Sequence, residues 1–105
     1  MTNMNTSKRA ADVDSLPPSE AARLREVMGA GETIVLCLAT DYTLAGMFGT
    51  EWLVLTNRRV YGVGGEGIVR VALSDIHRVM ILDYQGNSIL RVFTESQAYD
   101  VVRYS

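Results

Sequence analysis

The chain has 105 residues, of which 48% are hydrophobic, ten are basic and twelve are acidic. This length suits a single domain, and the composition allows a buried core. The net charge of −2 lacks the basic excess typical of proteins that bind a phosphate backbone, which argues against nucleic acid as the main partner.

Residues 1–15 are polar and lack the apolar stretch of a signal peptide, so we expect a disordered tail ahead of one domain over residues 16–105. The longest apolar run, Ile34 to Ala39, is far shorter than the roughly 20 residues that span a membrane. Within it lies the only cysteine, Cys37, which can form no internal disulfide and is predicted to be a small buried hydrophobe. These features favour a cytoplasmic protein.

The segment Pro18 to Met28 is predicted to form a short amphipathic helix, because its proline suits a first helical turn. Four apolar residues recur at helical spacing, namely Ala21, Leu24, Val27 and Met28. We expect Gly29 and Gly31 to end the helix, since glycine accepts the left-handed conformation of a C-cap. The apolar stripe could serve as a lid on the fold or as a dimer contact.

After Gly31 the hydrophobic pattern becomes typical of strands. The expected strands are Thr33 to Thr40, Trp52 to Thr56, Val60 to Val63, Ile68 to Leu73, Ile76 to Asp83, Ser88 to Thr94 and Tyr99 to Tyr104. The first two are uniformly apolar and are therefore expected to be central. Asp41 to Thr50 is predicted to be a loop or a short edge strand, and Tyr84 to Asn87 a hairpin turn.

This pattern predicts a mainly β fold with one N-terminal helix, in which an antiparallel meander of six to eight strands closes into a small barrel or a sandwich, the barrel being the favoured form. The residues expected to line most of its core are Trp52, Leu53, Leu55, Val71, Leu73, Ile76, Val92 and Val101. Because the last predicted strand runs directly into Ser105, we expect a chain truncated before a C-terminal helix.

No set of residues predicts catalysis. The run from Gly62 to Gly67 matches G-x-G-x-x-G, but a strand pattern follows where a dinucleotide site needs a helix, so a hairpin turn is favoured over nucleotide binding. Ser74, Asp75 and His77 fall within four residues of one strand and its entry turn, which is too close for them to converge as a hydrolase triad. With one histidine and one cysteine, a zinc site has no support. We expect no enzyme activity, cofactor or metal.

Arg58, Arg59, Arg70 and Arg78 all fall in the sheet region and could form a patch for lipid phosphates or an acidic partner. Acidic residues are interleaved with them, which favours an ordinary surface of mixed charge.

Two stretches resemble bacterial pleckstrin-homology-like and GRAM-like domains. Trp52 to Tyr61 is similar to their "LTNxR" strand-turn-strand, and Val71 to Val79 resembles the "iplsdIxxV" start of another strand. Gly31-Glu32 is similar to the "pGE" that precedes their first strand. The order of elements also resembles the cytosolic domain that some bacterial ABC transporters carry ahead of their membrane segments.

The resemblance implies a bent, seven-stranded barrel that is capped by a C-terminal helix and binds proteins or lipids without catalysis. The cations that lipid-binding relatives carry between their first two strands are missing from Asp41 to Gly46. We therefore expect a regulatory, protein-binding module, with a weak membrane-surface contact through the arginines as the alternative. With no helix after Tyr104, an open barrel end and a free strand edge predict a homodimer.

Overall fold

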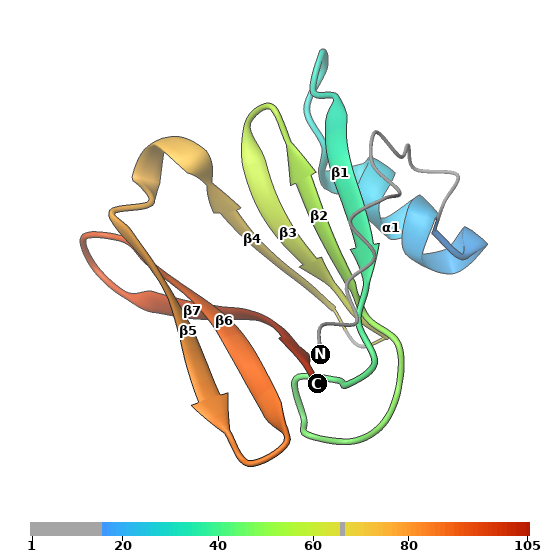
Figure 1. Ribbon diagram of the computed structural model, residues 1–105. Helices are drawn as coiled ribbons and strands as arrows, with labels where there is room; N and C mark the ends of the chain where they lie inside the picture. Colours follow the sequence, from blue (N-terminus) through green and yellow to red (C-terminus); the bar gives the residue numbers. More distant parts are fainter. Residues whose placement is uncertain (1–15, 66) are drawn as a thin grey trace.

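The computed structural model describes residues 16–65 and 67–105, which form one α-helix and seven strands (Figure 1). These elements are α1 (Pro18–Val27), β1 (Ile34–Ala39), β2 (Trp52–Thr56), β3 (Arg59–Val63), β4 (Ile68–Ala72), a 3-10 turn η2 (Leu73–Asp75), β5 (Arg78–Tyr84), β6 (Asn87–Phe93) and β7 (Ala98–Tyr104). The tail predicted for residues 1–15 lies outside the described residues.

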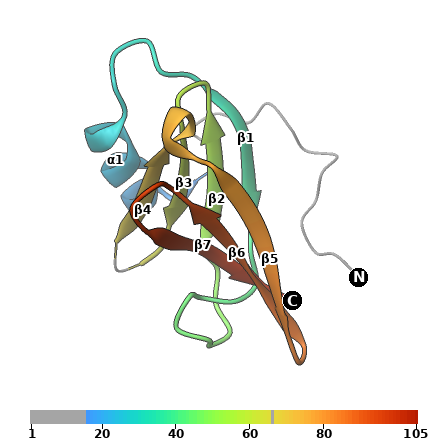
Figure 2. The same cartoon turned by 90° about the vertical axis from the view of Figure 1, so that its left-hand side faces the viewer.

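The strands form two antiparallel sheets, with the orders β1-β2-β3-β4 and β5-β6-β7. The prediction of a mainly β fold with one N-terminal helix is thereby confirmed. Among the described residues no strand of one sheet pairs with a strand of the other, and an isolated bridge joins Tyr42, in the β1–β2 connection, to Arg103 of β7. A closed barrel is therefore not confirmed, and Figure 2 shows the three-stranded sheet crossing in front of the larger one.

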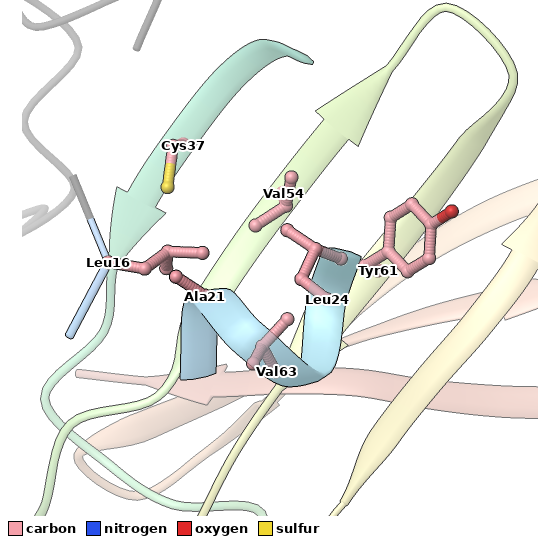
Figure 3. Close-up of a cluster of buried hydrophobic side chains, with 7 residues drawn as sticks. All are labelled: Leu16, Ala21, Leu24, Cys37, Val54, Tyr61 and Val63. Atoms are coloured by element: carbon pink, nitrogen blue, oxygen red, sulfur yellow. The ribbon is translucent and has the colours of Figure 1, made fainter. Parts of the chain in front are cut away.

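The four-stranded sheet has a hydrophobic core on each face. Between this sheet and α1 lies the first core, of Leu16, Ala21, Leu24, Cys37, Val54, Tyr61 and Val63 (Figure 3). Between the two sheets lies the second core, of Leu38, Leu53, Val60, Val71, Val92, Val101 and Val102. Successive strand residues point to opposite faces, so neighbours such as Cys37 and Leu38 enter different cores.

Burial on both faces explains the uniformly apolar β1, whose predicted central position is wrong. Among the described strands, β1 pairs with β2 alone and lies at the edge of its sheet. A register shift between Ile34 and Leu36 leaves Val35 half exposed. The apolar side chains of β1 are explained by the cores on both faces of its sheet and not by a strand neighbour on each side. Cys37 is buried, as predicted.

Helix α1 ends without the glycine cap that the sequence predicts. Met28 follows the helix in an extended conformation, with φ −72° and ψ 142°, and its N–H donates to the Leu24 carbonyl. Gly31, rather than Gly29, takes the left-handed conformation, with φ 77°, in the turn where the Glu32 N–H donates to the Gly29 carbonyl. The glycine therefore serves the turn into the sheet and not the helix end.

Most residues predicted for the core lie in it or against it. Leu53, Val71, Val92 and Val101 are buried, and Trp52, Leu55 and Ile76 pack against the cores as half-buried residues. Leu73 was predicted wrongly, since it is 38% exposed. β4 ends one residue earlier, and the chain bends into η2, which carries the Leu73 side chain away from the inner face.

Candidate functional site

A buried carboxylate lies where the turn before β1 meets the β2–β3 hairpin. Oxygen Oε1 of Glu32 accepts from the Gly29 N–H at 2.9 Å and from Nη1 of Arg59 at 2.8 Å. Its Oε2 accepts from the Thr56 hydroxyl at 2.5 Å and from the Tyr61 hydroxyl at 2.8 Å. The Glu32 side chain is fully buried. We call Glu32, Thr56, Arg59 and Tyr61 the Glu32 cluster.

The partners of Glu32 keep it ionised. Burial by itself would raise the pKa of the carboxyl, but the hydrogen bonds from Thr56, Gly29 and Tyr61 and the charge of Arg59 outweigh it and hold the pKa below its ordinary value. Burial raises the pKa of the Tyr61 phenol, and the carboxylate beside it adds to this. The cluster thus holds a carboxylate whose two oxygens both accept hydrogen bonds, beside a neutral phenol. Such a network links the segments of the chain that contribute to it.

The Glu32 cluster contains residues of the motifs that resemble pleckstrin-homology-like domains. Glu32 comes from the "GE" pair, whereas Thr56 and Arg59 come from the "LTNxR" stretch. Asn57 of the same stretch accepts through Oδ1 from the Thr33 N–H at 2.9 Å. These short motifs therefore encode a link between the turn after α1 and the β2–β3 hairpin. The motifs predict the fold but not this contact, because the spacing of Glu32 from Thr56 shows no local pattern.

The glycine-rich run forms the β3–β4 hairpin, as predicted. The Gly64 N–H donates to the Gly67 carbonyl at 2.9 Å and closes the turn. A Cβ on Gly67 would meet nothing within 4 Å, whereas the third glycine of a dinucleotide site allows close packing. A Cβ on Gly64 would lie 2.9 Å from the carboxyl carbon of Glu51. A carboxylate beside the turn disfavours an anionic nucleotide.

We therefore expect NAD and ATP to leave the melting temperature of the protein unchanged at millimolar concentration. A ligand that binds the folded state alone raises the melting temperature by mass action, so thermal unfolding with increasing nucleotide is a direct measurement. A saturable rise in melting temperature would contradict this prediction.

Ser74, Asp75 and His77 lie at the surface of the chain. Ser74 and Asp75 belong to η2, and His77 follows it with its N–H donating to the Phe93 carbonyl at 2.7 Å. All three side chains are exposed. Within residues 16–65 and 67–105, no group of three or more His, Cys, Asp or Glu residues could hold a metal ion.

The four candidate arginines lie in different settings. Arg59 is half buried in the ion pair with Glu32, and Arg58 is exposed in the β2–β3 turn beside it. Arg70 is exposed on β4, whereas Arg78 belongs to the other sheet, where its guanidinium lies 4.4 Å from the centre of the Phe93 ring. The structure thus places the four on two sheets and uses one of them in the Glu32 cluster.

The helix stripe of Ala21, Leu24, Val27 and Met28 faces the four-stranded sheet. Ala21 and Leu24 are buried in the first core, and Val27 and Met28 pack against it. The stripe is therefore covered within one chain and acts as a lid on the outer face of the larger sheet.

Among the described strands, β5 carries most of the exposed large hydrophobic side chains, a feature that the sequence pattern did not predict. Val79 is 53% and Ile81 is 47% exposed, and Met80 and Tyr84 are also exposed. Val79 pairs with Val92, and Ile81 pairs with Leu90. Val92 belongs to the second core and Leu90 packs against it. Cross-strand partners share a face of the sheet, so Val79 and Ile81 lie on the face that carries the second core, yet their side chains remain exposed to solvent.

β5 is also a sheet edge, because among the described strands it pairs with β6 alone. The Thr94 N–H donates to the Gln97 carbonyl at 2.8 Å, so the backbone of Thr94 is directed to the β7 side of β6. The preceding residue, Phe93, is then directed to β5, where it is paired with Arg78.

Backbone direction alternates along a strand, which fixes the groups at the free edge. Because Arg78 is directed to β6, the backbone groups of Met80, Leu82 and Tyr84 are directed to β6 as well. The N–H and C=O groups of Val79, Ile81 and Asp83 point away from β6. Strand β5 thus combines exposed apolar side chains with unpaired backbone groups, the two features of a site for strand addition.

The connection between β1 and β2 carries a second exposed apolar group. Phe48 is 84% exposed and Met47 is 67% exposed, and the Phe48 ring meets Tyr42 edge-on at 5.0 Å between centres. This connection lies at the opposite end of β2 from Arg58, because β2 runs between the two. The cationic turn and the apolar loop therefore do not share one end of the sheet.

Comparison of the chain with protein-family models, with curated proteins and with solved structures finds no match. The resemblance to pleckstrin-homology-like and GRAM-like domains therefore stays a prediction. In the described part of the chain, no helix has the length and apolar character needed to cross a membrane.

Proposed function

We propose that the chain is a non-catalytic, cytosolic protein-interaction module that binds an extended segment of a protein along the free edge of β5. The observation that carries this proposal is the combination, in one strand, of exposed Val79 and Ile81 with outward backbone groups at the same positions. An added strand gains backbone hydrogen bonds at the edge and covers the exposed apolar side chains.

The wider setting that we propose is a pleckstrin-homology-like or GRAM-like regulatory domain, at the N-terminus of a membrane-associated bacterial protein such as an ABC transporter. Seven strands in two antiparallel sheets support this proposal. The contact of Glu32 with Thr56 and Arg59 supports it too, because it gives the resembling motifs a common structural role.

Selection of displayed random heptapeptides on the purified protein tests the binding mode. We expect enrichment of sequences with apolar residues at alternate positions, and loss of their binding in Ile81→Pro. The Ile81 N–H points to the free edge, so proline there removes an outward donor without removing a β5–β6 hydrogen bond. No enrichment, or equal binding to Ile81→Pro, would contradict the proposal.

The alternative is a membrane-surface module that uses the arginines. The exposed side chains of Phe48 and Met47 favour this alternative, because apolar side chains at a loop tip can insert into a lipid surface. The placement of Arg58 at the other end of β2 disfavours this alternative.

We expect the protein to stay in the supernatant with vesicles rich in phosphatidylserine at low and high salt. Salt-sensitive sedimentation that is lost in the double variant Arg58→Ala, Arg70→Ala would support the alternative instead. Arg59 is unsuitable for this test because it holds Glu32.

A further inference from the structure

We infer that the segment bound at the edge of β5 is β5 of a second copy, which runs antiparallel to the first and is centred on Ile81. Two three-stranded sheets then join into one continuous sheet across a two-fold axis. This inference rests on the proposed function and names the partner of that site.

The backbone selects this register. Hydrogen-bonded pairs in an antiparallel ladder need outward groups on both residues. Centring on Ile81 places Ile81 opposite Ile81 of the second copy and Val79 opposite Asp83 of the second copy. The backbone N–H and C=O groups of all these residues point to the free edge. A shift by one residue would oppose an outward residue to an inward one. The same register overlaps the full length of β5, Arg78–Tyr84, so the pairing that satisfies the backbone also has the largest overlap.

The side chains fit the same pairing. On the face of the second core, Val79 and Ile81 of both copies form one apolar surface. On the other face, Met80 lies opposite Leu82, and Arg78 lies opposite the exposed ring of Tyr84, to which a guanidinium is attracted. A second copy paired in parallel through the same edge would be turned over, which would put the exposed Val79 and Ile81 of the two chains on opposite faces, so these side chains favour antiparallel pairing.

The assembly closes at two copies. A two-fold axis uses the free edge of β5 in both chains at once. The other outer strand of this sheet, β7, contacts β2, β3 and β4 and bridges to Tyr42 through Arg103. Further strands therefore have no equivalent edge in the three-stranded sheet to extend, and a pair forms rather than a fibre.

Cysteine substitution tests the register. In the dimer the Cα atoms of the two Ile81 residues lie about 5.5 Å apart, which a disulfide can span. We expect Ile81→Cys to form a covalent dimer under mild oxidation. The matched control is Val79→Cys, whose counterparts lie roughly 14 Å apart and should not cross-link. The unmodified chain reports the background, since Cys37 is buried. Equal cross-linking of the two variants, or none in Ile81→Cys, would overturn the inference.

Light scattering on size-exclusion peaks across a hundredfold dilution tests the assembly. We expect twice the 11.6 kDa chain mass at high concentration, and the single chain mass for Ile81→Pro with an unchanged circular dichroism spectrum. A dimer that persists in Ile81→Pro would place the contact elsewhere and overturn the inference. A single-chain mass for the unmodified protein at every concentration would also overturn it. If that monomer still selects heptapeptides, the proposed function stands, and if it selects none, both fail.

Discussion

Replacing Gly62 by alanine is expected to lower the free energy of unfolding by about 3 kcal/mol, the upper end of the usual cost of overpacking. Gly62 lies on the inner face of β3, between its cross-strand neighbours Leu53 and Val69. A Cβ there would lie 2.9 Å from the carbonyl carbon of Val101 and closer still to its oxygen, nearer than real Cβ atoms come to non-bonded atoms. The obstacle is backbone of β7, which a change of rotamer cannot move aside.

For a domain of this size, that loss corresponds to a fall in melting temperature of roughly 10–25 °C. The measurement is thermal unfolding followed by circular dichroism. The matched control is Gly65→Ala in the same glycine-rich run, where a Cβ would meet nothing within 4 Å. We expect that change to alter stability by less than about 0.5 kcal/mol. Similar melting of the two variants would show that β7 does not cross β3 at Gly62.

Glu32→Ala is expected to lower the free energy of unfolding by about 3–5 kcal/mol, as when one member of a buried, hydrogen-bonded ion pair is removed. The change takes away the acceptor of the Thr56 and Tyr61 hydroxyls and of the Gly29 N–H, and it leaves the Arg59 charge without its partner. The matched control is Asp100→Ala, which breaks the half-exposed pair with Arg91. That pair should contribute no more than about 1 kcal/mol. Equal losses in urea unfolding would contradict a special role for the Glu32 cluster.

The same carboxylate predicts how stability depends on pH. The pKa of Glu32 in the folded protein lies below the ordinary value of 4.5, so below that pH the unfolded chain binds a proton more readily than the folded chain. The stabilisation from Glu32 is therefore complete above pH 4.5 and is lost as pH falls through the folded pKa. We expect the melting temperature of the unmodified protein to fall more steeply with acid than that of Glu32→Gln. Parallel curves would show that Glu32 is not held in its charged form.

The helix and the strands could be predicted from the sequence because they depend on local patterns. Apolar residues at helical spacing identified α1, and alternation or short apolar runs identified all seven strands to within one or two residues at each end. The two-residue turn at Gln85-Gly86 followed from its glycine, which has φ 85°. Burial of Cys37 and of most core residues followed from the same periodicity.

Features that depend on distant segments could not be predicted in this way. The sequence predicted that Gly62 belongs to a turn, but its lack of a side chain is needed where β7, some forty residues later, crosses β3. Glu32 was noted in the sequence only as part of the Gly31-Glu32 pair, and its contacts with Thr56 and Tyr61 depend on the fold. Solvent exposure depends on which sheet face is covered, so Cys37 and Leu38 of the edge strand β1 are buried, whereas apolar residues of the edge strand β5 are left exposed. By itself the sequence determined where the chain forms helix and strand, because backbone preference and side-chain alternation act between near neighbours. Only the tertiary structure decided which polar groups meet, which glycine is indispensable and which strand remains free to bind, because these depend on contacts between segments far apart in the chain.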